Sequence, residues 1–170
     1  MMPKEGELNK EEKMSGFSLL GVVVSLFLVT VGLLGFTGLF SAMEALSAQN
    51  KNDLVAGFLA QEGIEIVRRI RENASELNWS DWHSSVSSGD YSVQYDSSDL
   101  EPFQSAPLKF DQNTFVYSYD SGNNSLFYRT VRLQKVDDDQ TVVSVIISWS
   151  SKGNNYSLTL EDILYNWIKE

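Results

Sequence analysis

The sequence contains no cysteine and only one histidine, His83. The absence of cysteine excludes disulfides, zinc–thiolate sites and thiol nucleophiles, so packing alone must hold the fold together. Ser84, His83 and Asp81 supply the residue types of a hydrolytic triad. A triad, however, needs groups that converge in space on a rigid frame, and three neighbours in one serine-rich loop do not provide it. We therefore expect that the protein is not an enzyme.

Basic residues are also scarce, because 13 Lys and Arg stand against 23 Asp and Glu and give a formal net charge of −10. A nucleic-acid binder needs a basic surface that neutralises phosphates, so no nucleic-acid partner is predicted. The one basic cluster, Arg68, Arg69 and Arg71, is interleaved with Glu65 and Glu72. On a helix this spacing predicts ion pairs of Glu65 with Arg69 and of Arg68 with Glu72. A solvated, self-paired face is the favoured interpretation, and DNA contact is the minor alternative.

Charged side chains are missing altogether from residues 17–40. This block of 24 residues exceeds the roughly 20 residues that a helix needs to cross a bilayer. The apolar region of an ordinary signal peptide is only about 7–15 residues long. Lys4, Lys10 and Lys13 precede the block, whereas Lys51 is the first basic residue after it. The positive-inside rule therefore predicts a single-pass membrane protein with a cytoplasmic N-terminus.

Three glycines, Gly32, Gly35 and Gly38, lie at intervals of three in this block. Small residues let helices approach closely in lipid, which makes these glycines candidate assembly residues. Each glycine also weakens a helix by about 1 kcal/mol relative to alanine and so favours local unwinding. Ordinary tolerance of glycine in membrane helices is the other interpretation.

The helical pattern continues beyond the apolar block, because residues 41–73 lack proline and are rich in helix formers. An apolar stripe runs through this segment at spacings of four, seven and four: Val55, Leu59, Ile66 and Ile70. Smaller residues flank it at similar spacing: Ala56, Ala60, Gly63 and Val67. The stripe predicts a helix that lies against a sheet. One continuous helix over residues 17–73 would be about 85 Å long.

Residues 74–114 change to a serine- and aspartate-rich composition and are expected to form a long connection with a short strand at residues 91–95. Trp79 and Trp82 are expected to pack onto the end of the long helix, with a surface binding role as the alternative. Further along, four segments alternate apolar and polar residues between turn signals. They are residues 115–119, 126–136, 141–149 and 156–164. Successive strands joined by tight turns predict an antiparallel meander with one face in need of cover.

These patterns predict an α+β protein in which a long N-terminal helix packs on a C-terminal antiparallel meander. The expected segments are a charged N-terminal stretch (1–16), a transmembrane helix (17–40), its amphipathic continuation (41–73) and a loop-and-sheet domain (74–170). No cofactor or metal is expected. Asp137, Asp138 and Asp139 offer oxygen ligands for calcium, but the glycine and the spaced glutamate of an EF-hand loop are missing, so an exposed hairpin turn is favoured.

Residues 15–20 read SGFSLL, at the junction of the charged stretch and the apolar block. This resembles the processing site of the type IV prepilin and pseudopilin family, in which a short hydrophilic leader ends in glycine and Phe or Met follows. Lys13 matches the basic flank usual in the family, although the leader is acidic overall. The resemblance is one of motif over residues 13–40 and one of architecture over residues 41–170.

The resemblance implies that residues 1–16 are a leader, which a prepilin peptidase removes by cutting between Gly16 and Phe17. The new amine of Phe17 would then be N-methylated. The mature chain would wait in the inner membrane until an assembly machinery extracts it into an extracytoplasmic filament with other pilin or pseudopilin subunits. A helix that is apolar all round is soluble either in lipid or among copies of itself, so one segment can serve as anchor and then as filament core.

Two positions depart from the family pattern. The family usually has glutamate at the fifth residue after the cut, where it is thought to pair with a neighbouring subunit's amine, and this chain has Gly21. A buried charge without its partner is costly, so the departure implies a minor subunit of low copy number, at the filament tip or in an initiation complex. The alternative is that an unwound, glycine-rich helix relaxes this requirement and allows incorporation into the shaft. The family also often has a proline within the membrane helix. Here the three glycines would replace its unwinding effect.

Three functions follow, in order of preference. The first is a minor pilin or pseudopilin of a pilus, a secretion filament or a DNA-uptake apparatus. The second is a non-assembling, membrane-tethered domain that binds a ligand or partner outside the cell. The third is an extracytoplasmic hydrolase that uses the loop around His83.

Overall fold

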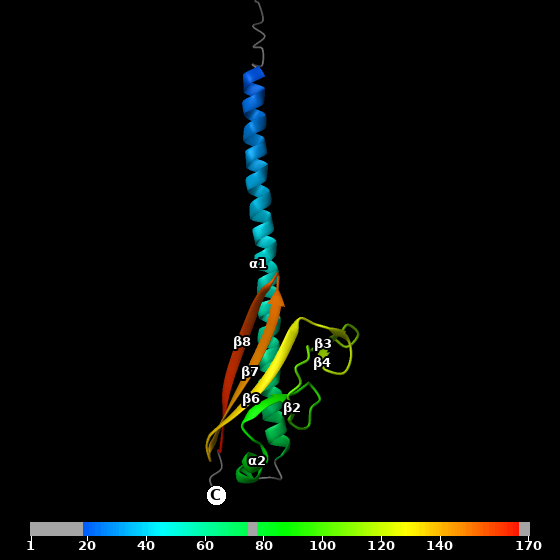
Figure 1. Ribbon diagram of the computed structural model, residues 1–170, viewed down its shortest axis with the longest axis vertical. Helices are drawn as coiled ribbons and strands as arrows, with labels where there is room; N and C mark the ends of the chain where they lie inside the picture. Colours follow the sequence, from blue (N-terminus) through cyan, green and yellow to red (C-terminus); the bar gives the residue numbers. More distant parts are fainter. Residues whose placement is uncertain (1–18, 75–77, 167–170) are drawn as a thin grey trace, which may run out of the picture. The chain divides into compact units, whose positions relative to one another are not determined.

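The computed structural model describes residues 19–74 and 78–166, and the chain divides into two compact units between Leu46 and Ser47. The predicted processing residues Gly16 and Phe17 lie outside the described residues. The first element, α1 (Leu19–Asn73), is a single α-helix of 55 residues (Figure 1). It runs without a break through all the glycines of its apolar part, so no unwinding is present there.

The later part of α1 packs on a sheet through the predicted stripe. Leu59, Ile66 and Ile70 are buried, and Val55 is partly buried. The residues that were predicted to flank the stripe lie at the centre of the contact between helix and sheet. Ala56, Ala60, Gly63 and Val67 are all buried. Small side chains let the helix axis approach the sheet closely, which places these residues nearest to the strands.

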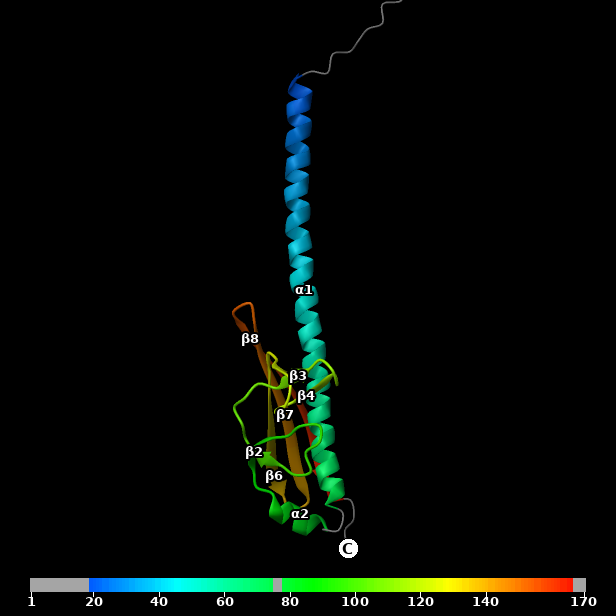
Figure 2. The same cartoon turned by 90° about the vertical axis from the view of Figure 1, so that its right-hand side faces the viewer.

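The sheet has five strands in the order β2-β1-β6-β7-β8. Their bounds are β1 Gly89–Ser92, β2 Glu101–Pro102, β6 Phe127–Asp137, β7 Gln140–Ser151 and β8 Asn154–Tyr165. All neighbours pair antiparallel, and β6, β7 and β8 form a meander joined by tight turns. The end of α1 lies alongside this sheet in both views (Figures 1 and 2). The predicted α+β class, a long helix on an antiparallel meander, is confirmed.

Residues 115–119 were predicted to form the first strand of that meander, and this prediction is wrong. The strand of this segment, β4 (Val116–Ser118), joins β3 (Lys109–Asp111) and β5 (Asn123–Asn124) in a separate three-stranded sheet. Phe115 has φ of 58°, a left-handed conformation, so β4 begins only at Val116. Gly122 has φ of 104°, and a side chain there would meet the carbonyl of Phe110 at 2.5 Å. Glycine therefore allows this turn to close onto β3.

The core lies between α1 and the strands β6 and β7, whose burial alternates along each strand. A chain of aromatic contacts extends it across the sheets. The ring of Tyr117 lies 6.2 Å from Phe127, Phe127 lies 5.9 Å from Trp149, and Trp149 stacks on Tyr156 at 5.7 Å between ring centroids. Edge-to-face and offset rings of this kind stabilise a core beyond the area that they bury.

The connection after α1 contains a short helix that the sequence did not predict, α2 (Trp79–Ser85). The side chain of Asn78 caps it by accepting a hydrogen bond from the backbone of Asp81 at 2.9 Å. Trp79 and Trp82 are both buried, as the packing interpretation expected. The indole of Trp79 donates to the carbonyl of Asp138 at 2.6 Å and lies beneath the guanidinium of Arg71, so α2 joins the helix end to the β6–β7 turn.

Candidate functional site

The candidate functional site is the apolar surface of α1 from Leu19 to Leu46. Every large apolar side chain of this segment is exposed, from 41% at Val22 to 82% at Leu19. Contiguous apolar surface of this extent marks a membrane or interaction surface, because water solvates it poorly. Among the described residues, α1 is the one helix long and apolar enough to cross a membrane, and a signal sequence near the N-terminus has the same character.

The polar groups of this surface are already satisfied within the helix. Its apolar stretch up to Phe40 holds three hydroxyl side chains, Ser25, Thr30 and Thr37. They donate hydrogen bonds to backbone carbonyls three or four residues earlier, at 2.7, 2.7 and 3.0 Å. A hydroxyl bonded in this way needs no water, so the segment can lie in lipid or against another helix without leaving a polar group unpaired.

The four glycines of the segment are open to their surroundings. A side chain built on Gly21, Gly32, Gly35 or Gly38 would meet no atom within 4 Å. At 100° per residue, Gly21, Gly32 and Gly35 fall within about 60° of one another around the helix, while Gly38 lies further round. These three glycines therefore share one face, on which another helix could approach closely.

The attachment of α1 to the sheet includes a buried arginine that the sequence patterns did not predict. Arg129, on β6, has a fully buried side chain. It donates to the carboxylate of Glu62 at 2.7 Å, to the carbonyl of Leu59 at 3.3 Å and to the carbonyl of Val93 at 2.7 Å. One guanidinium therefore links α1, β6 and the segment after β1. Its inward position in the alternation of β6 was the one available sequence signal, since Phe127 and Val131 flank it two residues away.

Two arginines of the α1 cluster, Arg68 and Arg69, bond to residues outside the helix. Arg68 donates to Asp162 of β8 at 3.0 Å and lies 3.8 Å from Glu65, which replaces the predicted pair with Glu72. The bond to Asp162 raises the pKa of Arg68. Arg69 donates to the carbonyl of Tyr95 at 2.6 Å instead of pairing with Glu65. The cluster is thus held by tertiary contacts together with one ion pair within the helix, and the two predicted pairs are not formed.

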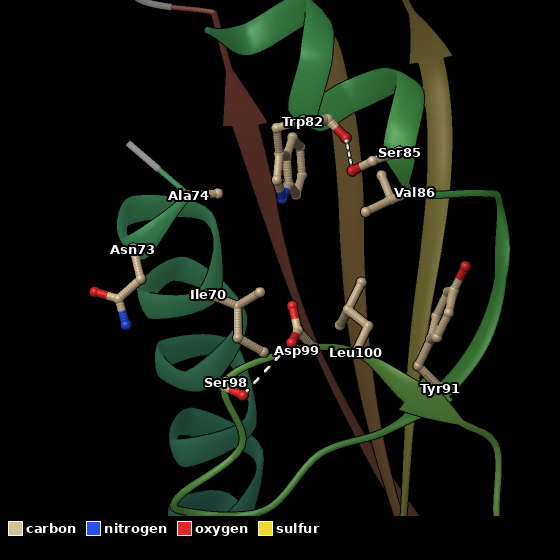
Figure 3. Close-up of a pocket in the computed structure, with 10 residues that line it drawn as sticks. All are labelled: Ile70, Asn73, Ala74, Trp82, Ser85, Val86, Tyr91, Ser98, Asp99 and Leu100. Atoms are coloured by element: carbon tan, nitrogen blue, oxygen red, sulfur yellow. Dashed lines mark hydrogen bonds between the residues drawn. The ribbon is translucent and has the colours of Figure 1, made fainter. Parts of the chain in front are cut away.

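A groove of about 610 Å³ opens where α1 ends, between α2 and β1 (Figure 3). Ile70, Trp82 and Leu100 give it apolar walls. Of the polar groups at its rim, the hydroxyl of Ser85 donates to the carbonyl of Trp82 at 2.8 Å, and that of Ser98 lies 3.5 Å from the carboxylate of Asp99. The rim hydroxyls are therefore engaged locally.

The candidate triad residues around His83 and the candidate calcium ligands of the acidic turn make contacts that stabilise the fold. The ring of His83 stacks on Trp79 at 5.6 Å, and no hydrogen bond of the described residues joins it to Ser84 or Asp81. In the acidic turn, Asp137 accepts from the backbone of Asp139 at 2.9 Å. Within residues 19–74 and 78–166, no three His, Cys, Asp or Glu side chains form a group that could hold a metal ion.

The architecture is pilin-like in that a long N-terminal apolar helix packs against a C-terminal antiparallel sheet. Comparison of the chain with models of known families, with curated proteins and with solved structures finds no match.

Proposed function

We propose that this chain is a minor pilin or pseudopilin, a structural and assembly subunit of a type IV pilus-like or type II secretion filament. One observation carries the proposal: within a single helix of 55 residues, the first part is apolar and exposed all round, and the later part is buried on an antiparallel sheet. The first part needs an apolar environment, and the later part fixes a folded domain to it.

In this proposal, α1 first anchors the chain in the cytoplasmic membrane with the N-terminus in the cytoplasm. The satisfied hydroxyls of Ser25, Thr30 and Thr37 suit that environment. An assembly machinery in the inner membrane then transfers the helix into a filament, where helices of other subunits replace the lipid. The face formed by Gly21, Gly32 and Gly35 is the side on which a neighbouring helix packs most closely.

Maturation precedes assembly. A prepilin peptidase cuts between Gly16 and Phe17, and the new amine of Phe17 is methylated. Glycine at the position before the cut lets the peptidase approach the backbone, and bulk at that position blocks the cut.

Mass spectrometry of the N-terminus, after co-expression with a prepilin peptidase, tests the proposal. We expect a mature chain that begins at methylated Phe17, accumulation of precursor for Gly16→Glu, and normal processing of the neighbouring control Ser15→Ala. A chain that keeps its leader in the presence of an active peptidase would contradict the assignment. It would favour the membrane-tethered binding domain instead.

A further inference from the structure

Strand β8 leaves one edge of the five-stranded sheet open. No described strand lies beyond it (Figure 1). All twelve of its residues pair with β7 without a register break. Natural proteins protect such edges with short strands, prolines, lysines or bulges. The opposite edge has this protection, because β2 is two residues long and contains Pro102. β8 contains neither proline nor lysine, and Arg68 neutralises its one inward-facing charge, Asp162.

The register shows which backbone groups of β8 point away from the sheet. The backbone N–H of Asn166 donates to the carbonyl of Asp139 at 3.0 Å, in line with the neighbouring pair of Tyr165 and Gln140. Hydrogen-bonded and non-hydrogen-bonded pairs alternate in an antiparallel ladder. The backbone groups of the even-numbered residues of β8 therefore bond β7, and those of the odd-numbered residues point to the open edge. The described residues that present an N–H and a carbonyl to the open edge are Asn155, Ser157, Thr159, Glu161 and Ile163.

Two adjoining hollows of about 520 and 550 Å³ lie beside this edge, between β8 and α1. Arg68 and Asp162 border both. On α1, the other charged residues of the two hollows are Glu62, Glu65, Arg71 and Glu72. Alternate side chains of a strand added to β8 would point toward α1 and enter these hollows.

The charges beside the edge decide which strand fits. Arg68 is paired with Asp162, and Glu62 is paired with the buried Arg129. Glu65, which also lies 3.8 Å from Arg68, and Glu72 remain against Arg71, so the groove keeps a net negative charge. Two copies of this edge would repel each other, since each brings the same acidic groove. A strand with lysine or arginine on the side facing α1 would be attracted.

We infer that β8 is a docking edge for an extended segment of a partner protein, which adds as an antiparallel strand and directs lysine or arginine side chains into the groove beside α1. Backbone hydrogen bonds to the five outward-facing residues of β8 supply the affinity, and the acidic groove supplies the specificity. This inference rests on the sheet edge and on the groove beside it, and does not depend on filament assembly.

A nine-residue peptide of alternating Val and Lys, added to the full chain in non-ionic detergent, tests the inference. Amide exchange is measured by NMR. We expect the N–H groups of Ser157 and Thr159 to exchange at least about tenfold more slowly with peptide, because they become hydrogen-bonded. The amides of Leu158 and Leu160 already bond β7 and should not change.

Two methylated peptides provide matched controls. If lysines face α1 in an antiparallel addition, the valine amides bond β8 and the lysine amides point away. N-methylation of the valines should therefore abolish binding, whereas N-methylation of the lysines should leave it within about twofold. Equal binding of the two, or loss only for the lysine-methylated peptide, would overturn the proposed antiparallel addition. A second copy of the chain on this edge, seen as self-association that the peptide displaces, would also overturn it.

Variants of Thr159 test the same edge from the protein's side. Thr159→Pro removes an outward N–H without removing a bond to β7, and proline is tolerated on edge strands. We expect it to weaken binding of the Val–Lys peptide at least about tenfold, while Thr159→Val, which keeps the N–H, stays within about twofold of the unmodified chain. Undiminished binding by Thr159→Pro would contradict strand addition at this edge.

Discussion

At the scale of single residues, the contact between α1 and the sheet depends on two unlike residues, Gly63 of α1 and Arg129 of β6. Gly63 is the point of closest approach, since a side chain there would meet Val145 at 2.8 Å. Arg129 lies next to it and fills the remaining space with a buried charge. Glycine is often buried, whereas arginine is rarely buried unless it is paired, as Arg129 is with Glu62.

Gly63→Ala should destabilise the protein. The added methyl forces Val145, which is buried and β-branched, to move, and overpacking of this kind costs about 1–3 kcal/mol. The gain in helix propensity of about 1 kcal/mol offsets part of that cost. Gly57→Ala, in the same helix with no atom within 4 Å of the new methyl, should instead stabilise by about 0.5–1 kcal/mol. Denaturant unfolding followed by tryptophan fluorescence measures both, and changes of the same sign would contradict the packing described.

Glu62→Ala leaves the guanidinium of Arg129 buried without its counter-ion. Breaking a buried ion pair costs about 3–5 kcal/mol, but Glu62 is about one-third exposed, so water reduces the expected cost to about 1–3 kcal/mol. Arg129→Met fills a similar volume without a charge. In the Glu62→Ala background it should therefore cost less than in the unmodified chain. A double-mutant cycle measures this coupling, and additive effects would show that the two side chains act independently.

At the scale of elements, β1 is held to β6 by few backbone pairs and by a surface ion pair. Three residues of β1 pair with β6, and Arg132 donates two hydrogen bonds to the carboxylate of Asp90, at 2.7 and 3.0 Å. The hydrogen bonds from Arg132 lower the pKa of Asp90. A two-pronged contact of this kind fixes the register of a short strand better than a single bond.

The Asp90–Arg132 pair should make stability depend on pH. Because the pKa of Asp90 is lower in the folded chain, its contribution is present above the unfolded value of about 3.9 and is lost as the pH falls through the folded value. Both side chains are partly exposed, so Arg132→Gln should cost at most about 1 kcal/mol at pH 7. Unfolding free energies measured from pH 7 down to about 2.5 should converge for the two proteins. A constant difference over this range would contradict the assigned role.

The strands differ in how well the sequence predicted them. Long alternating segments predicted the bounds of β6, β7 and β8 closely, because alternation over nine or more residues is not typical of a helix. β3 and β5, with three and two residues, are too short to show a period. The placement of β4 beside β3 rather than β6 depends on the turn at Phe115 and on the contact of Phe110 with Tyr117, 4.9 Å between ring centroids.

At the scale of the whole molecule, the proposed function concerns where a subunit sits among its neighbours. Gly21 lacks the carboxylate that the resembled family uses to receive a neighbour's amine. In a dry filament core, an amine left without that partner is costly, so a subunit of this kind is tolerated best at the tip, with no subunit ahead of it. The open surroundings of Gly21 show that the chain itself would accommodate a larger residue there.

We therefore expect low copy number and a tip or initiation-complex location, measured by immunogold labelling and by quantitative proteomics of purified filaments. Gly21→Glu should move the subunit into the shaft, since it restores the missing partner. Gly32→Ala, a change at an equally open site without a charge, serves as the control. Labelling of the unmodified chain along the whole shaft, at an abundance near that of the major subunit, would rule the tip location out.

The sequence by itself determined the features that repeat along the chain. The uncharged block predicted an apolar helix, the spacing of Leu59, Ile66 and Ile70 predicted its buried side, and alternation predicted the meander. Each is a local property, because a side chain's direction is set by the period of its own element. The processing residues Gly16 and Phe17 were also predicted from the sequence, and their role stays a prediction.

Only the tertiary structure decided which elements meet and at what distance. It placed Ala56 and Gly63 at the centre of the helix–sheet contact and buried Arg129 between three segments. It also assigned β4 to a second sheet and placed β8 at the edge of the five-stranded sheet, with no strand of the described residues beyond it. These features depend on residues far apart in the chain, and the period of a single element contains no information about its partner. The buried arginine is favourable only because the carbonyl of Val93 and the carboxylate of Glu62 converge on it in the folded domain.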